Sequence, residues 1–351
     1  MHAMMPGHGK DDENPDLPSG VFPDEEEPED SAWFLAPPDE DVSRPPLPLA
    51  DRTPPIDARE WRRAQADLAA ELAHLALRFG ALDERLRTAP AGWRQRLALA
   101  EAAELSWWCG DRVPADRLAL WVGLHLAGVQ GDPLALARAA WAVRRLQGGP
   151  GPEAGLAEFL GRQAGEGLAG RIADWQAAMA GIDDLHPFVQ AGCGLHLWRL
   201  ADVSGTGQAA EIEGPVVMAR LAARAGRGGA AFLPVALAGA GGLRGGGPVV
   251  DRLARWLAGA EQATLTALLQ LDRLEAWQAR ADGALKNLSG RTPPLLARLF
   301  SAFPFVSAPL AEAETGASRA AVQRNLDLMV AAGLVREVTG QGRYRLWSAK
   351  L

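Results

Sequence analysis

The sequence predicts an all-helical body that is followed by a small unit of three helices and a β-hairpin. Leucine, alanine and tryptophan recur at helical spacing from residue 57 to about residue 287, and strand-like alternation begins only at Leu334. The chain has 351 residues, of which 48% are hydrophobic, so it is long enough to bury the core of such a body.

Residues 1–55 are expected to form an acidic, proline-rich tail that is disordered. They contain 12 of the 25 prolines, and 14 acidic residues against three basic ones. Such a segment buries too little apolar surface to offset the entropy lost on ordering. Trp33, Phe34 and Leu35 interrupt the tail, either by chance or as a short segment that docks on the folded body.

Residues 56–290 are predicted to form the helical body. The first helix starts at Asp57, with a break or kink at Gly80, and a later helix starts after His186-Pro187-Phe188. The remaining helices are expected over residues 91–108, 115–126, 132–146, 154–163, 167–180 and 249–287. The pair Trp107-Trp108 is expected to pack in the core.

The segment 224–248 is rich in glycine and surrounds an apolar run at residues 231–237. A phosphate-binding loop requires regularly spaced glycines and a following Gly-Lys-Ser/Thr, which this segment lacks. We therefore predict a mobile surface loop.

Charge and cysteine content restrict the function. The net charge of −7 is unevenly distributed along the chain, because residues 291–351 carry eight basic and four acidic residues. Cys109 and Cys193 have neither metal-site spacing nor a disulfide pattern, so no metal, no cofactor and a reducing cytoplasm are expected. The chain shows no secretory signal and no apolar run long enough to span a membrane. Abundant Ala, Arg and Gly with few Lys suggest a GC-rich bacterial genome.

Residues 291–351 are predicted to contain three helices. Gly316 makes the tight turn between the second helix, residues 309–315, and the third. Ser318 is the expected N-cap of the third helix, because its hydroxyl accepts an unpaired first-turn N–H. Apolar side chains give these helices their core faces: Leu295, Leu296, Leu299, Phe300, Ala317, Val322 and Leu326.

A β-hairpin is predicted after the third helix. Residues 334–339 form an alternating strand, Gly340-Gln341-Gly342 makes the turn, and residues 343–347 return as the second strand. Three helices followed by a hairpin are the order of a winged helix-turn-helix. This fold reads DNA in many proteins and mediates protein interactions in others. The positive charge of residues 291–351 favours double-stranded DNA as the partner.

Six residues are predicted to contact DNA: Ser318, Arg319, Gln323, Arg324, Arg343 and Arg345. The first four face outward from the third helix, where glutamine suits adenine and arginine suits guanine. Arg343, near the hairpin turn, would reach a phosphate or the minor groove. The second helix is one residue longer than the common pattern and carries Glu312 and Glu314, which weaken attraction to a nearby phosphate.

Segments 318–326 and 334–340 resemble the C-terminal winged helix of many bacterial Fic-domain proteins, and they look most similar to a group of uncharacterised bacterial helix-turn-helix proteins. His186-Pro187-Phe188 resembles the start of the Fic motif, His-Pro-Phe-x-Asp/Glu-Gly-Asn-Gly-Arg-x-x-Arg. The resemblance implies a Fic-like helical bundle. It places His186 where the family has the general base that activates a hydroxyl for transfer of AMP from ATP.

The sequence departs from the Fic motif after three residues. Gln190 replaces the Mg²⁺-binding carboxylate, residues 191–193 read Ala-Gly-Cys in place of Gly-Asn-Gly, and Gly194 and Leu197 replace the two arginines. The motif thus lacks its metal ligand and its phosphate partners. The segment 106–110 faintly resembles the family's inhibitory segment, with Gly110 at the position of its glutamate. The resemblance therefore implies a decayed enzyme with a vestigial His186.

The favoured hypothesis is a bacterial DNA-binding protein, a transcriptional regulator whose helical body forms a homodimer or senses a partner. Two alternatives stay open. One is a divergent Fic-type transferase of AMP or phosphate groups that uses His186. The other is a protein-interaction scaffold with the acidic tail as its docking arm. Cys193 has no visible catalytic partner and is expected to be a small buried residue.

Overall fold

The computed structural model describes residues 56–124, 132–162, 166–205, 209–286, 288, 290–339 and 345–351. All of them belong to one compact unit. The predicted disordered tail, the hairpin turn and Arg343 lie outside the described residues.

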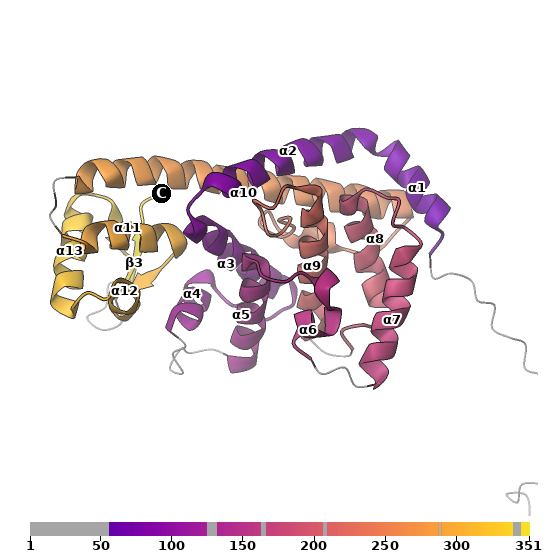
Figure 1. The fold of residues 1–351 in the computed structure, drawn as a ribbon, viewed down its shortest axis with the longest axis horizontal. Helices are drawn as coiled ribbons and strands as arrows, with labels where there is room; N and C mark the ends of the chain where they lie inside the picture. Colours follow the sequence, from indigo (N-terminus) through magenta and orange to yellow (C-terminus); the bar gives the residue numbers. More distant parts are fainter. Residues whose placement is uncertain are drawn as a thin grey trace, which may run out of the picture. The chain divides into compact units, whose positions relative to one another are not determined.

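The body consists of α-helices, which are shown in Figure 1. They are α1 (Ala58–Asp67), α2 (Ala69–Thr88), α3 (Ala91–Trp108), α4 (Ala115–Leu124), α5 (Pro133–Gln147), α6 (Leu156–Leu160), α7 (Glu166–Ala180), α8 (Pro187–Leu200), α9 (Ala209–Ala222) and α10 (Val249–Leu285). Short 3-10 helices lie at η2 (Pro152–Ala154), η3 (Ala223–Ala225) and η4 (Ala240–Leu243).

Local sequence signals set several of these boundaries as predicted. Helix α3 spans the predicted residues 91–108. Helix α5 follows Asp132, whose carboxylate accepts the N–H of Leu134 at 2.8 Å, and Pro133 occupies its first turn. Helix α8 begins at Pro187, directly after His186.

The predicted break at Gly80 is wrong. Helix α2 continues through Gly80, and the chain bends at Leu68 instead, where φ −106° and ψ 28° leave the helical range. A Cβ at Gly80 would meet no atom within 4 Å. The glycine therefore lies on an open face of the helix and does not interrupt it.

Helix α9 was not among the predicted elements. Residues 212–219 are buried without a break, and Pro215 lies inside the helix. A helix that is buried on all sides gives no clear amphipathic pattern, and an internal proline argues against a helix. Its packing against α5 and α8 therefore determines a structure that its sequence pattern did not indicate.

The prediction of a mobile surface loop at 224–248 is also wrong, because the apolar run of this segment is buried. Phe232 is 4% exposed, and Leu233 is fully buried. Asp83 of α2 accepts the N–H groups of Arg227 and Ala230, both at 2.7 Å. Gly229 lies so close to α2 that a Cβ would collide with the carbonyl oxygen of Asp83.

A second buried carboxylate holds the same segment. Glu101 of α3 is fully buried and accepts the N–H groups of Val235, Ala236 and Leu237 at 2.8, 2.9 and 3.1 Å. These bonds satisfy backbone donors that would otherwise be buried without a partner. Residues 229–237 of the glycine-rich segment are therefore an irregular part of the core, whereas residues 244–248 are exposed.

Helix α10 connects the body to the C-terminal region. Its 37 residues pack against α1, α2 and α8 in the body and against α11 (Thr292–Ala302) beyond it. Figure 1 shows α10 extending from beneath α2 to the C-terminal helices. Within the described ranges, no helix is both long and apolar enough to cross a membrane.

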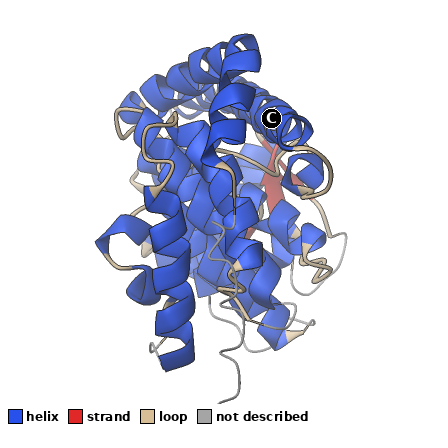
Figure 2. Ribbon diagram, turned by 90° about the vertical axis from the view of Figure 1, so that its right-hand side faces the viewer, coloured by secondary structure: helices blue, strands red, loops and turns tan. Residues whose placement is uncertain are grey.

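The C-terminal region has the predicted three helices and hairpin strands, together with one strand that was not predicted. After α11 come β1 (Val306–Ser307), α12 (Ala308–Thr315), α13 (Arg319–Ala331), β2 (Val335–Glu337) and β3 (Leu346–Ala349). The antiparallel sheet has the order β1-β3-β2, with Val306 opposite Trp347 and Val335 opposite Ala349. Strand β1 is two residues long, which is too short to show alternation. Figure 2 shows that strands form only a small part of a helical fold.

Candidate nucleic-acid interface

The turn between α12 and α13 has the predicted tight geometry. Gly316 adopts φ +64°, which L side chains rarely tolerate, and its N–H bonds to the carbonyl of Glu312 at 2.9 Å. Ser307 caps α12 by accepting the N–H of Leu310, and Ser318 caps α13 by accepting that of Ala321 at 3.4 Å. These caps and the turn fix the start of α13 relative to α12.

Helix α13 has a buried apolar side and an exposed basic side. Val322, Leu326 and Met329 are fully buried. Arg319 and Arg324 are exposed, and neither forms an ion pair or a side-chain hydrogen bond within the described part of the chain. The main contacts of α13 are with α11, α12 and β2, so its basic side is not covered by the body. These two arginines are the available cations of the predicted interface.

Gln323 lies on the same helix, but its amide is already engaged. Its Nε2 donates to Oδ1 of Asp327 at 2.9 Å, and the side chain is half-buried. Asp327 also places a negative charge one turn beyond the arginines. Contact of Gln323 with a base would therefore require this bond to be exchanged.

Arg345 is paired within the hairpin. Its guanidinium forms an ion pair with Glu337 and lies 4.9 Å from the centre of the Trp347 ring. The hydrogen bond from Arg345 is the main cause that lowers the pKa of Glu337 below its ordinary value. The paired charge attracts a phosphate less strongly than the unpaired arginines of α13. The predicted contact at Arg343 lies outside the described residues.

The acidic residues of α12 are positioned as the sequence suggested. Glu314 is exposed, and Glu312 is half-buried. Helix α12 spans eight residues, Ala308–Thr315, and ends at Gly316. The helix-turn-helix therefore presents negative charge on α12 and positive charge at the start of α13.

A buried arginine that sequence analysis did not single out joins the C-terminal region to the body. Arg96 of α3 donates from Nη1 to the carbonyl oxygens of Phe300 and Phe303, each at 3.0 Å. The carbonyl of Phe300 has no helical donor, because residue 304 is proline. Burial lowers the pKa of Arg96 to about 10, which keeps it charged at neutral pH.

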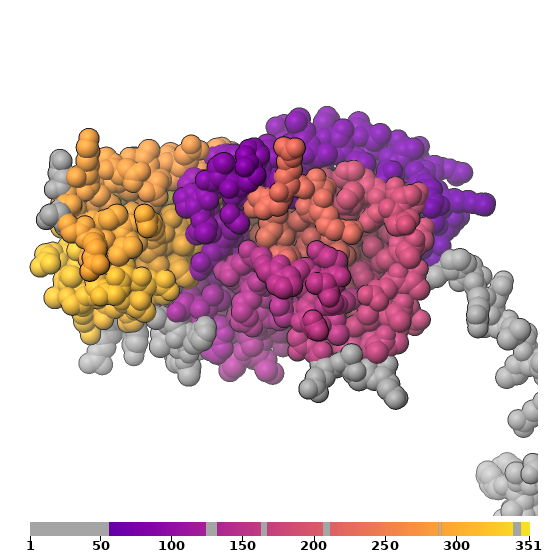
Figure 3. Space-filling view, in the orientation of Figure 1, coloured from indigo at the N-terminus to yellow at the C-terminus, as the bar shows by residue number. Residues whose placement is uncertain are grey.

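Further contacts hold the same junction. Trp277 of α10 donates to the carbonyl of Leu334 at 2.8 Å. A Cβ at Gly92 of α3 would lie 2.7 Å from the Cβ of Ala302, so only glycine allows α3 and α11 to pack this closely. In Figure 3 the orange and yellow C-terminal region lies directly against the indigo and purple helices of the body. The C-terminal region is thus packed on the body through α3, α4 and α10.

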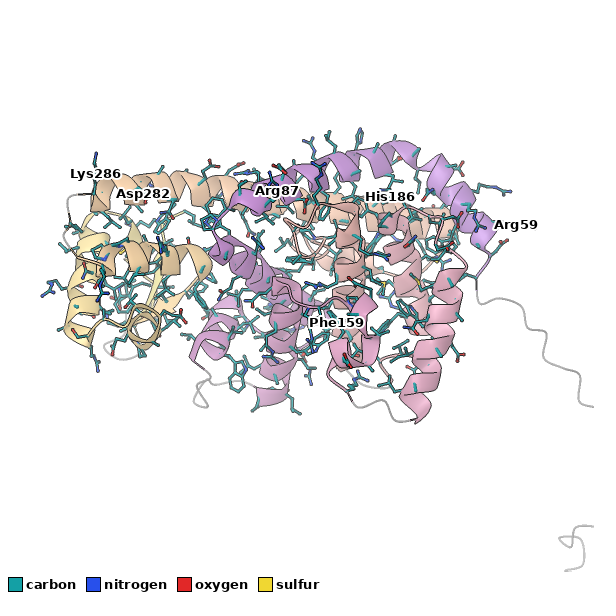
Figure 4. The ribbon with its side chains drawn as sticks, viewed as in Figure 1. Arg59, Arg87, Phe159, His186, Asp282 and Lys286 are labelled. Atoms are coloured by element: carbon teal, nitrogen blue, oxygen red, sulfur yellow. The ribbon has the colours of Figure 1, made fainter. Side chains whose placement is uncertain are left out.

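His186 lies in the body, well away from the C-terminal helices, as Figure 4 shows. Its Nδ1 accepts the N–H of Phe188 at 3.2 Å, so the side chain acts as the N-cap of α8. Burial lowers its pKa. Within the described ranges, no group of three or more His, Cys, Asp or Glu residues is arranged to hold a metal ion.

The other positions of the divergent motif serve packing and hydrogen bonding. Gln190 donates to the carbonyls of Asp183 and Leu185 and accepts from Arg224, which engages both ends of its amide. A Cβ at Gly192 would lie 2.8 Å from the Trp256 ring. An asparagine at this position would therefore collide with the ring.

Cys193 and Ser106 of the body are buried, whereas Trp107 is exposed. Cys193 is fully buried, as expected, and burial raises the pKa of its thiol to about 12. Ser106 is buried and bonds to the carbonyl of Ala103 at 2.7 Å. The expectation that Trp107 packs in the core is wrong. It is 53% exposed, and Arg112 lies 5.8 Å from its ring. Trp108 is half-buried.

Residues 293–349 match the family model of an HTH DNA-binding domain. The matched residues extend from α11 to β3 and include the turn at Gly316 and the whole of α13. No curated protein matches the chain. The C-terminal region is therefore a helix-turn-helix domain of the DNA-binding type.

Proposed function

We propose that this protein binds double-stranded DNA through α13 and regulates transcription. The observation that carries the proposal is the exposed, unpaired Arg319 and Arg324 at the start of a helix that follows a tight helix-turn-helix turn. In this arrangement α13 enters the major groove with its first two turns. The arginines then contact guanine edges or phosphates.

Other groups at the start of α13 support the same orientation. Its first-turn N–H groups carry the positive end of the helix dipole, which favours a phosphate. Ser318 already caps one of these groups, so its hydroxyl is a positioning group and a secondary DNA contact. Because Arg345 is already paired with Glu337, Arg343 is the wing residue proposed to reach the DNA backbone.

Replacing both Arg319 and Arg324 with alanine is expected to lower the affinity for DNA roughly a hundredfold. Each lost contact costs about 1.4 kcal/mol, which corresponds to a tenfold loss. Binding is measured by fluorescence anisotropy, on duplexes selected from a random library, between 50 and 300 mM salt. The slope of log affinity against log salt should become less negative by about 2.

The matched control is Arg78→Ala with Arg273→Ala. Both arginines are exposed on body helices and form no ion pair within the described part of the chain. This variant should bind like the wild type. Equal affinity of the Arg319→Ala/Arg324→Ala variant and the wild type, with its circular dichroism unchanged, would refute the proposal.

We further propose that the body is a Fic-like domain without transferase activity. Support comes from the fully engaged amide of Gln190 and from the lack of space at Gly192. Incubation with labelled ATP and a protein substrate mixture should give no labelled product. Transfer that disappears in His186→Ala would establish the enzyme instead. We also propose that the protein forms a homodimer through the body. Analytical sedimentation of the full chain measures this oligomeric state.

A further inference from the structure

A cavity of about 510 Å³ lies in the body between α8, α9 and the segment that follows η4. Its apolar lining includes the half-buried Trp108, and the buried side chains of Trp198 and Leu243 lie beneath its floor. Its rim carries both signs of charge: Arg199, Arg244, Asp202 and Glu211. A volume of this size suits a small molecule, and an apolar floor with a few polar groups is typical of small-molecule sites.

The floor of the cavity depends on a close approach of α8 and α9. A Cβ at Gly214 would lie 2.9 Å from Cδ1 of Trp198, so only glycine leaves room for the indole here. The indole Nε1 donates to Oγ of Ser204 at 2.7 Å, which fixes the orientation of the ring. Trp198 is only 3% exposed, so it supports the base of the cavity, whereas the half-buried Trp108 is the tryptophan with surface accessible to a ligand.

Arg199 lies at the rim of the cavity, and only part of its guanidinium is hydrogen-bonded to the protein. Its Nη2 donates to the carbonyl of Leu243 at 2.7 Å, and Gly245 lies so close that a Cβ there would be 2.7 Å from Nη1. Arg199 and Arg244 form no ion pair within the part of the chain that the structure describes. A guanidinium has five N–H donors, so Arg199 has several available for a ligand carboxylate.

Acceptors occupy the rim as well. Pro215 has no N–H, so the carbonyl of Glu211 lacks its usual helical donor. Asp202 directly follows the C-cap residue of α8 and adopts φ +48°, the left-handed conformation that often ends a helix, and this places its carboxylate at the rim. The cavity therefore offers both cationic donors and anionic acceptors above an apolar floor.

We propose that this cavity binds an α-amino acid with an apolar or aromatic side chain. The carboxylate contacts Arg199 and Arg244, and the ammonium contacts Asp202 and Glu211. The side chain lies beside Trp108, the half-buried tryptophan of the cavity lining. A purely anionic ligand fits less well, because two carboxylates share the rim.

The proposal includes a role as effector, which rests on the proposed DNA binding. Helix α3 ends at Trp108, which lines the cavity, and its first turns pack on α11 through Gly92 and Arg96. Between these ends, Glu101 holds the backbone of residues 235–237, and the same chain segment continues to the cavity at Leu243. Figure 1 shows α3 lying between α11 and α9.

Ligand binding is tested on the full chain without DNA, by calorimetric titration with L-phenylalanine. Phenylalaninamide lacks the carboxylate, and N-acetylphenylalanine lacks the ammonium. Each of these two analogues should bind at least about tenfold more weakly than L-phenylalanine, because it loses one charged contact. Equal affinity for the three compounds, or no binding of L-phenylalanine at millimolar concentration, would overturn the site.

Two variants test the two ends of the ligand separately. Arg244→Gln should lower the affinity for L-phenylalanine about tenfold and leave the affinity for phenylalaninamide unchanged. Glu211→Gln should leave the affinity for N-acetylphenylalanine unchanged. Both residues are exposed, so the fold tolerates the changes, and Arg78→Gln is the matched control. Variants that bind all three compounds like the wild type contradict the assignment.

A separate measurement tests whether the bound amino acid is an effector of DNA binding. Saturating L-phenylalanine should change the affinity for a selected DNA duplex, and DNA should change the affinity for L-phenylalanine by the same factor. An unchanged DNA affinity overturns the effector role. A chain that binds L-phenylalanine but no DNA overturns the proposed function and supports the cavity assignment.

Discussion

Replacing Arg96 with methionine is expected to lower the free energy of unfolding by about 3 kcal/mol. The variant leaves the carbonyls of Phe300 and Phe303 buried without a donor. Pro304 cannot replace the lost partner of Phe300, because proline has no N–H. Methionine fills a similar volume, so the loss measures the hydrogen bonds more than the packing.

Urea unfolding followed by circular dichroism measures this loss, with Arg78→Met as the exposed control. Hydrogen exchange should also speed up in α11, because Arg96 bonds to the carboxyl-terminal end of that helix. A loss below about 1 kcal/mol would show that the junction does not depend on this arginine. The same variant should weaken DNA binding if the body sets the position of α13.

The features of the helix-turn-helix that were predicted from sequence depend on local interactions. The turn at Gly316 and the cap at Ser318 involve residues within four positions of each other. The buried positions Val322 and Leu326 follow the helical period. Because each signal is contained within a few residues, a single sequence is sufficient to place α13 and its exposed arginines.

The features that were missed depend on residues far apart in the chain. The glycine-rich segment looks like a surface loop, because its partners Asp83 and Glu101 are more than 130 residues away. The acceptors of Arg96 are backbone carbonyls, which every sequence contains. Arg345 was expected to face DNA, and only the strand register of the hairpin shows that Glu337 is within reach.

These long-range contacts connect the glycine-rich segment to both proposed sites. The segment is anchored on α3 by Glu101, and α3 also carries Arg96 at the junction with the helix-turn-helix. Further along, the segment supplies Leu243 and Arg244 to the cavity. A change in the charge of Glu101 therefore acts on the element that links the cavity to the DNA-binding domain.

The stability that Glu101 contributes is expected to fall as pH rises. Burial is the main cause that raises the pKa of Glu101 from 4.5 to about 7 in the folded protein, against the lowering effect of three backbone N–H bonds. Between these values the folded state keeps a proton that the unfolded state releases. The contribution is therefore fully present below pH 4.5, is lost as pH rises through 7, and amounts to about 3 kcal/mol.

Glu101→Gln isolates this effect, because glutamine is uncharged at every pH and its amide oxygen still accepts backbone N–H bonds. The difference in unfolding free energy, wild type minus variant, should fall by about 2 to 3 kcal/mol between pH 5 and pH 8. Urea unfolding at each pH measures it, and other titrating groups cancel in the difference. A difference that is constant over this range would mean that Glu101 is ionised throughout. The three N–H bonds would then outweigh the burial of its charge.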